Sequence, residues 1–244
     1  MSAEVQPKIE AIAPLPQPGT RRVLAVSDII EPQLYNARVA EWLNHIDLII
    51  SCGDLPASYL DFLITALNAP CYHVIGNHCG GPHGSSGTEH CPPEAYPGVS
   101  DLNGRAVNFN RLLLAGVEGS PWYNGGPHQY TENQIRRQLW RLIPSLMLNR
   151  LRTGRYLDIL VTHAPPRGIH DETDITHRGF TSFLWFLRTF RPLYMLHGHT
   201  HRYIKSLPFS TRYANTIIVN AYGHHLLEIP VDPQLLLYAE RDGH

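Results

Sequence analysis

The sequence is poor in cysteine, in long apolar runs and in net charge. Its four cysteines among 244 residues are too few and too irregularly spaced for a disulfide framework. No apolar run reaches the roughly 18 residues of a membrane span, so we expect no membrane partner. The net charge of −1, with histidine neutral, excludes a global basic field that would recruit nucleic acid.

The first 20 residues also lack the apolar segment of a signal peptide. They contain Pro7, Pro14, Pro16 and Pro18 instead, which indicates a flexible tail over residues 1–20. We therefore expect a cytoplasmic location, where cysteines stay reduced. No internal repeat or linker divides residues 21–244, so we expect them to form a single domain.

Short apolar runs alternate with helical patterns, which predicts an α/β fold. The strand–helix–strand order of the first half favours parallel strands, and the last two strands are expected to form an antiparallel pair. Thr131 and Gln134 form a capping box, and Pro144 is expected to kink or restart the helix that follows. Residues 79–104 form a long loop without periodicity. We expect strands at residues 22–27, 46–51, 70–75, 105–109, 111–116, 156–162, 192–197, 213–219 and 225–229, and helices at 36–44, 57–68, 131–148 and 180–190.

Side chains that can bind a metal ion follow five of these strands. Histidine, the commonest metal ligand, is abundant, with 15 residues. In open α/β sheets, ligands bind at the carboxyl ends of the strands, and that is where these side chains are expected. They are Asp28, Asp54, Asn77 with His78, His163, and His199 with His201.

This donor set consists of oxygens and imidazole nitrogens, which suits a borderline or hard divalent ion. It exceeds the four ligands of one tetrahedral ion. Two ions roughly 3.5–4 Å apart that share a carboxylate would use the whole set, and such pairs hydrolyse phosphoesters. Each short motif alone is a weak signal, because turns and surface strands contain the same residues. The ordered set is far more specific.

In these motifs the chain resembles the calcineurin-like metallophosphoesterase superfamily, over residues 22–229. The family pattern is D-x-H, GD, GNH followed by an acid, a lone His, and GHxH. The resemblance implies a four-layer αββα sandwich with two mixed β-sheets flanked by helices. Residues 119–122 (GSPW) and 162–171 (THAPPRGIHD) are most similar to a small bacterial branch. The matching segments are Asp28-Ile29-Ile30, Gly53-Asp54, Gly76-Asn77-His78-Cys79, His163 and Gly198-His199-Thr200-His201.

The resemblance also implies what each residue does. Asp54 would bridge two divalent ions, for which Mn, Fe and Zn all suit the ligands. A bridging hydroxide would be the nucleophile. His78 would protonate the leaving oxygen or stabilise the transition state. The implied ligands are Asp28, Asp54 and His201 for the first ion, and Asp54, Asn77, His163 and His199 for the second.

Two positions depart from the family pattern. Ile30 stands where the family has a histidine that binds the first ion, so we predict a weaker first site. Water, Glu31 or His177 are the candidates for the missing ligand. Cys79 stands where the family often has an acid outside the metal shell, so its effect is expected to be limited to fine tuning.

Two further segments have alternative interpretations. Arg167 and His177 follow His163 closely, so they are expected near the metal edge, where they could bind a phosphate. The alternative is pairing with acids of their own loop. The other segment is the loop that contains Cys79, His83, His90 and Cys91. It could form a zinc site or a disulfide, but its glycines favour a loop at the rim of the site.

The sequence therefore predicts a metal-dependent phosphoesterase acting on a small-molecule phosphomonoester or phosphodiester. One alternative is a degenerate metal-binding scaffold with little or no catalysis. Ile30 favours that alternative, whereas His78 disfavours it, because a scaffold has no chemical need for it. The other alternative is a nuclease, which the near-zero net charge disfavours.

Overall fold

Two mixed β-sheets form the centre of the molecule. The computed structural model describes residues 19–78, 98–201 and 209–231. The five-stranded sheet has the order β13 (Gly223–Pro230), β1 (Thr20–Ser27), β2 (Leu48–Ser51), β3 (Cys71–His73) and β4 (Val99–Asp101). The six-stranded sheet has the order β11 (Ser210–Tyr213), β12 (Thr216–Asn220), β10 (Tyr194–His197), β9 (Ile159–Thr162), β6 (Leu112–Val117) and β5 (Ala106–Phe109). A separate short pair is formed by β7 (Ser120–Pro121) and β8 (Gln129–Tyr130).

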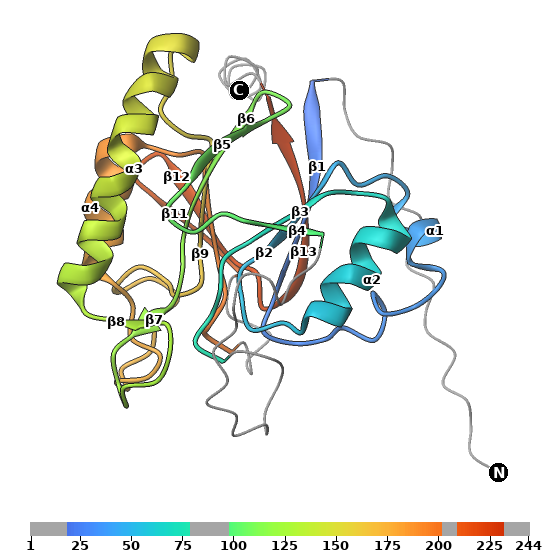
Figure 1. Ribbon diagram of the computed structural model, residues 1–244, viewed down its shortest axis with the longest axis horizontal. Helices are drawn as coiled ribbons and strands as arrows, with labels where there is room; N and C mark the ends of the chain where they lie inside the picture. Colours follow the sequence, from blue (N-terminus) through green and yellow to red (C-terminus); the bar gives the residue numbers. More distant parts are fainter. Residues whose placement is uncertain (1–18, 79–97, 202–208, 232–244) are drawn as a thin grey trace, which may run out of the picture.

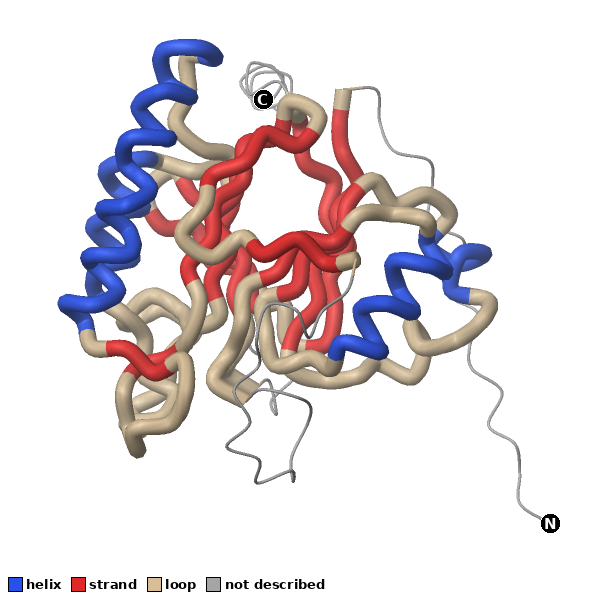
Figure 2. Tube along the Cα trace, viewed as in Figure 1, coloured by secondary structure: helices blue, strands red, loops and turns tan. Residues whose placement is uncertain are grey.

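Helices cover the outer face of each sheet. Helices α1 (Val39–Leu43) and α2 (Ala57–Leu67) lie against the five-stranded sheet. Helices α3 (Glu132–Thr153) and α4 (Thr181–Phe190) lie against the six-stranded sheet. Figure 1 shows the two helix pairs at opposite sides of the molecule, and Figure 2 shows the strands between them. The predicted four-layer αββα sandwich is confirmed.

The central strands are buried on both faces, which explains their continuous apolar runs. In β1, Val23 and Ala25 belong to the apolar cluster between the two sheets. The alternate residues, Leu24 and Val26, belong to the cluster under α1 and α2. Successive side chains of a strand point to opposite faces, so β1 joins two cores and the residue after it is placed rigidly.

The parallel pairing predicted for the first half is confirmed, since β1, β2 and β3 run parallel. The pairing predicted for the last two strands is wrong. β12 pairs with β11 and β10 in the six-stranded sheet, whereas β13 crosses to the five-stranded sheet and pairs antiparallel with β1. The predicted strand 213–219 spans a hairpin turn, where Ala214 has a φ of 52°. The preceding strand β11 has no continuous apolar run, because it lies at an edge and is only partly buried.

Helix α3 also differs in part from the prediction. The capping box of Thr131 and Gln134 is confirmed. The helix does not restart at Pro144 but continues through it to Thr153. Pro144 is exposed, while Leu142 and Leu146 on either side are buried against the sheet and keep the helix in place. Among the described helices, α3 included, none combines the length and apolarity that a bilayer crossing needs.

Two predictions concern residues at the margins of the described part. The predicted tail, residues 1–20, lies outside the described residues except for its last two, and β1 already begins at Thr20. Within the predicted loop 79–104, residues 99–101 form β4, which pairs with β3. The possible zinc or disulfide residues of that loop lie outside the described residues.

Candidate metal centre

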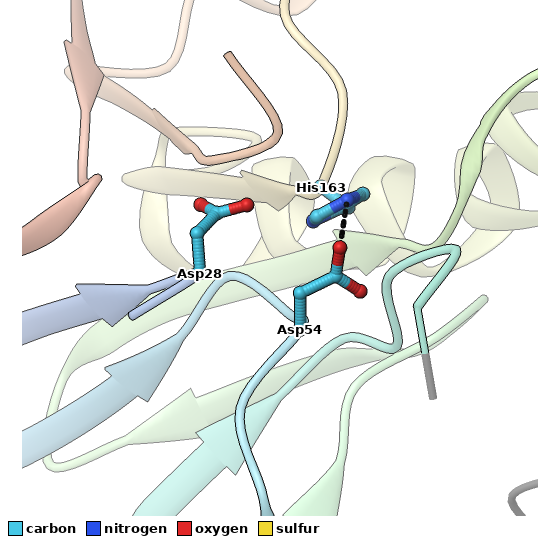
Figure 3. Close-up of side chains that lie close together, drawn as sticks. All are labelled: Asp28, Asp54 and His163. Carbon is cyan, nitrogen blue, oxygen red and sulfur yellow. Dashed lines mark ion pairs between the residues drawn. The ribbon is translucent and has the colours of Figure 1, made fainter. Parts of the chain in front are cut away.

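The carboxyl ends of strands from both sheets meet at one edge of the sandwich. Asp28 follows β1, Asp54 follows β2 closely, and His163 directly follows β9 of the opposite sheet. One ligand atom of each side chain lies within 4.8 Å of the others, and all three residues are buried. Figure 3 shows the two carboxylates and the imidazole converging. The predicted meeting of strand ends therefore occurs at these three residues.

The backbone at this edge is held in an unusual conformation. Asp28, Asp54 and His199 have φ values of 67°, 57° and 67°, in the left-handed region that non-glycine residues rarely adopt. The backbone N–H of Asp28 donates to the carbonyl of Gly53, with N and O 3.2 Å apart. Such strain persists only where the surroundings enforce it, and it is concentrated at functional sites.

His163 provides the clearest sign of a cation site. Its Nδ1 lies 2.7 Å from the carbonyl oxygen of Cys52, so Nδ1 carries the proton in the neutral ring and Nε2 has a lone pair. That Nε2 faces Oδ1 of Asn77 at 3.0 Å and Oδ2 of Asp54 at 3.3 Å. Three electron-rich atoms converge here, and either a proton or a metal ion is needed between them. The donor set suits a divalent metal ion.

Asn77 is oriented by a residue that the sequence analysis did not select. Its Nδ2 donates to the hydroxyl oxygen of Tyr123, 3.1 Å away, and this bond directs Oδ1 towards His163. Fixing the amide orientation in this way is typical of residues that support metal ligands. Tyr123 follows the GSPW segment, but its position in the sequence carries no signal for this contact.

His199 lies beside the other candidate ligands. Its backbone N–H donates to both carboxylate oxygens of Asp28, each 3.1 Å away. Its Nε2 lies 2.7 Å from the carbonyl oxygen of Thr176, and its ring centre is 4.9 Å from that of His163. Burial, and after it His163, lower the pKa of His199 to about 3. The ring is therefore neutral, with Nδ1 available as a ligand.

Three glycines permit this close packing. A Cβ on Gly53 would lie 2.7 Å from both Nδ1 of His163 and the backbone nitrogen of Gly76. A Cβ on Gly76 would overlap the Asp54 carboxylate, and one on Gly198 would overlap Ser27 and the Asp28 carboxylate. The glycines of the GD, GNH and GHTH segments thus provide the space that the side chains of Asp28, Asp54 and His163 occupy.

The remaining predicted residues are not part of the cluster of Asp28, Asp54 and His163. The side chain of His78 is exposed, and its backbone N–H donates to Oδ1 of Asp54, 2.8 Å away. The ring of His201 lies 5.7 Å from that of His177, centre to centre. Arg167 pairs with Asp171 at 3.4 Å, which is the pairing within the loop considered as its alternative.

The ion-pair network gives the metal-free site a pH-dependent charge. Burial raises the pKa of Asp28 to about 6, although His163 counteracts part of the rise. Burial by itself lowers the pKa of His163, but the carboxylates of Asp54 and Asp28 outweigh it and raise the pKa to about 9. In the metal-free protein near neutral pH, the proton on His163 therefore occupies the place of a cation.

Metal affinity is consequently expected to rise steeply with pH. A metal ion has to displace the protons of His163 and Asp28, whose pKa values are about 9 and about 6. Each displaced proton changes the apparent affinity by about tenfold per pH unit below its pKa. Titration of chelator-treated protein with Mn²⁺ at about pH 6 and about pH 8.5 measures this. Equal affinities at both values would contradict the expectation.

Comparison with known proteins agrees with this geometry. Residues 21–203 match the family model described as calcineurin-like phosphoesterase. The chain is 14% identical to TT1561 of Thermus thermophilus, with a TM-score of 0.53 over 87% of this chain and 100% of that chain. It is also 14% identical to the phosphopantetheinyl hydrolase PptH from Mycobacterium tuberculosis, with a TM-score of 0.51 over 88% of this chain and 98% of that chain. No curated protein matches it. The two structures share the fold, and the match over most of the sequence shows that the chain belongs to the calcineurin-like phosphoesterase family.

Proposed function

We propose that this protein is a metal-dependent phosphoesterase that hydrolyses a phosphomonoester or phosphodiester of a small molecule, in the cytoplasm and without nucleic acid as substrate. One observation supports this most strongly. Nε2 of His163 faces the oxygens of Asp54 and Asn77 at 3.3 and 3.0 Å, an arrangement that a proton satisfies in the metal-free protein and that a bound metal ion can satisfy in its place. The side chains come from both sheets of a fold whose family is phosphoesterase.

The proposed site holds two divalent ions, Mn, Fe or Zn. Bound ions would lower the pKa of water and stabilise the charge that develops on the phosphoryl group. Asp54 is central, because its Oδ2 faces His163 while its Oδ1 accepts the backbone N–H of His78. The proposed ligands are Asp28, Asp54 and His201 for the first ion, and Asp54, Asn77, His163 and His199 for the second.

His78 is the proposed catalytic residue. Its backbone is bonded to Asp54, so its exposed imidazole is tethered beside the centre without being enclosed in it. In this position it can transfer a proton to the leaving oxygen of a phosphoester. General acid catalysis of this kind contributes about 10²–10⁴-fold to a rate.

A degenerate metal-binding scaffold is the second candidate, and Ile30 is the observation in its favour. Ile30 packs against the apolar cluster of the five-stranded sheet and α1 and α2. The position that holds a histidine in the family pattern thus contributes to the core here. A scaffold would bind metal without hydrolysing any ester.

Substrate hydrolysis by the metal-restored protein separates the two candidates. Chelator-treated protein is supplied in turn with Mn²⁺, Zn²⁺ and Fe²⁺ and assayed on p-nitrophenyl phosphate and bis-p-nitrophenyl phosphate. A phosphopantetheinyl ester is a third substrate, chosen because the neighbour PptH is a phosphopantetheinyl hydrolase. We expect hydrolysis that falls about 10²–10⁴-fold in His78→Ala at unchanged metal content. Metal binding without hydrolysis of any ester would favour the scaffold.

A further inference from the structure

We propose that His177 is a ligand of the first metal ion and takes the place of the histidine that is missing at position 30. This inference rests on the proposed two-metal function and assigns one residue of that site. His177 lies in the loop between β9 and α4, about 150 positions from Ile30 in the sequence. A ligand contributed by a different segment leaves no trace in the D-x-H motif itself.

The position of the ring fits a ligand. The ring centre of His177 lies 5.7 Å from that of His201 and 5.4 Å from that of His199. Two imidazoles that bind one ion at tetrahedral angles, each through a nitrogen about 2.1 Å from it, have ring centres about 5 Å apart. The separation of His177 from His201, the proposed ligand of the first ion, is compatible with a shared ion, and so is its separation from His199. His199 joins this group to Asp28, whose carboxylate accepts its backbone N–H at 3.1 Å.

The orientation of the ring also fits. Nδ1 of His177 lies 3.1 and 3.2 Å from the two oxygens of Asp174, so Nδ1 carries the proton and Nε2 is the atom left to bind metal. A histidine that donates its other N–H to a carboxylate or carbonyl is the usual arrangement at metal centres. His163 and His199 show the same pattern, with the carbonyls of Cys52 and Thr176 as acceptors.

The loop that carries His177 is fixed to the site. Oδ1 of Asp174 accepts the backbone N–H groups of Thr176 and His177 at 2.9 and 3.0 Å. The neighbouring carbonyl of Thr176 in turn accepts Nε2–H of His199 at 2.7 Å. The same short turn thus orients His177 and holds His199, a proposed ligand of the second ion. Hydrogen bonds therefore fix the position of His177.

The competing candidate, Glu31, contacts β13 at the end of β1. Its Oε1 lies 3.8 Å from Nδ1 of His224 and occupies the space beside Gly223, where a Cβ would overlap it. Metal binding through Glu31 would require this carboxylate to leave its place at β13.

Mn²⁺ titration of metal-free protein, with free Mn²⁺ counted by electron paramagnetic resonance, tests the assignment. The full-length wild type is expected to bind two ions per chain, one more weakly. His177→Ala is expected to keep the tighter site and to weaken the other by at least about tenfold, since loss of even an outer partner costs 10–100-fold. Asp174→Asn is expected to weaken the same site to a smaller extent.

Two variants serve as matched controls. His45→Ala removes an exposed histidine that also pairs with a carboxylate, Asp47. Glu172→Gln alters the exposed Glu172–Asp174–His177 cluster without touching the ring. Both are expected to bind two ions as the wild type does. If Glu172→Gln abolishes the weaker site, that ion sits on the loop surface and the assignment is wrong.

Other outcomes also decide the assignment. Unchanged binding in His177→Ala overturns it, as does loss of the weaker site in Glu31→Gln alone. If His177→Ala loses the weaker ion but the metal-restored wild type hydrolyses no phosphoester, the ligand assignment stands and the proposed function fails. If the wild type hydrolyses phosphoesters and His177→Ala still binds both ions normally, the function stands and the assignment fails.

Discussion

Asp54→Asn is expected to lose both metal ions and the phosphoester hydrolysis that depends on them. The change keeps the size of the side chain and the Oδ1 that accepts the His78 N–H. It removes the negative charge that faces Nε2 of His163 at 3.3 Å and that both proposed sites share. Loss of an outer partner of a metal ligand costs 10–100-fold in affinity, so loss of a shared ligand is expected to cost more than about 100-fold. Elemental analysis after gel filtration, together with the hydrolysis assay, measures it.

Asp158→Asn is the matched control for this change. Asp158 is also a buried aspartate that pairs with a base, Arg155, at 2.6 Å, but it lies before β9, at the opposite end of the strand from His163. Its replacement is expected to lower the free energy of unfolding and to leave the metal content equal to that of the wild type. Equal metal loss in both variants would mean that general destabilisation, and not ligand loss, explains the result for Asp54.

Gly198→Ala is expected to disrupt the site by steric overlap alone. A Cβ at this position would overlap Ser27 and the carboxylate of Asp28, both buried at the end of β1. Overpacking of this kind costs about 1–3 kcal/mol of stability. Because β1 is held between two cores, the Asp28 side chain is expected to move, and with it the first metal ion. Metal titration and chemical denaturation measure the two effects.

Gly154→Ala is the control that separates a loss of stability from a loss of metal binding. Gly154 ends helix α3 with a φ of 81°, and a Cβ there meets nothing within 4 Å. Its replacement by a residue with a Cβ costs about 1–2 kcal/mol through the left-handed backbone, far from the metal centre. We expect reduced stability with normal metal binding. Normal metal binding in Gly198→Ala, in contrast, would show that the tight packing around Asp28 is not needed for the site.

The local parts of the site could be predicted from the sequence, because an apolar run followed by a polar residue is a short-range pattern. Asp28, Asp54 and His163 were predicted as strand-end ligands, and the structure brings their ligand atoms within 4.8 Å. The contacts that orient ligands join distant segments. Tyr123 bonds Asn77 across 46 positions, and Thr176 bonds His199 across 23. Sequence periodicity and motif spacing do not predict hydrogen bonds between residues so far apart in the chain.

In the fold, too, features set by local sequence could be predicted, whereas features set by contacts between distant segments could not. The continuous apolar runs of β1, β2, β9 and β10 are typical of strands buried on both faces, and the strand–helix–strand order of the first half predicted the parallel pairing of β1 and β2. The partner of β13 could not be predicted, because an antiparallel partner at an edge is chosen by tertiary packing. At Pro144 the local breaker signal was overruled by the burial of Leu142 and Leu146 against the sheet.

Metal-dependent hydrolysis by the wild-type protein is the most direct test of the proposed function. Chelator-treated protein is titrated with Mn²⁺ while the hydrolysis of bis-p-nitrophenyl phosphate is followed. The proposed function predicts no hydrolysis without metal, and hydrolysis that increases as the weaker of the two proposed sites fills. Hydrolysis that persists in the metal-free protein, or two filled sites with no hydrolysis of any phosphoester, would contradict it.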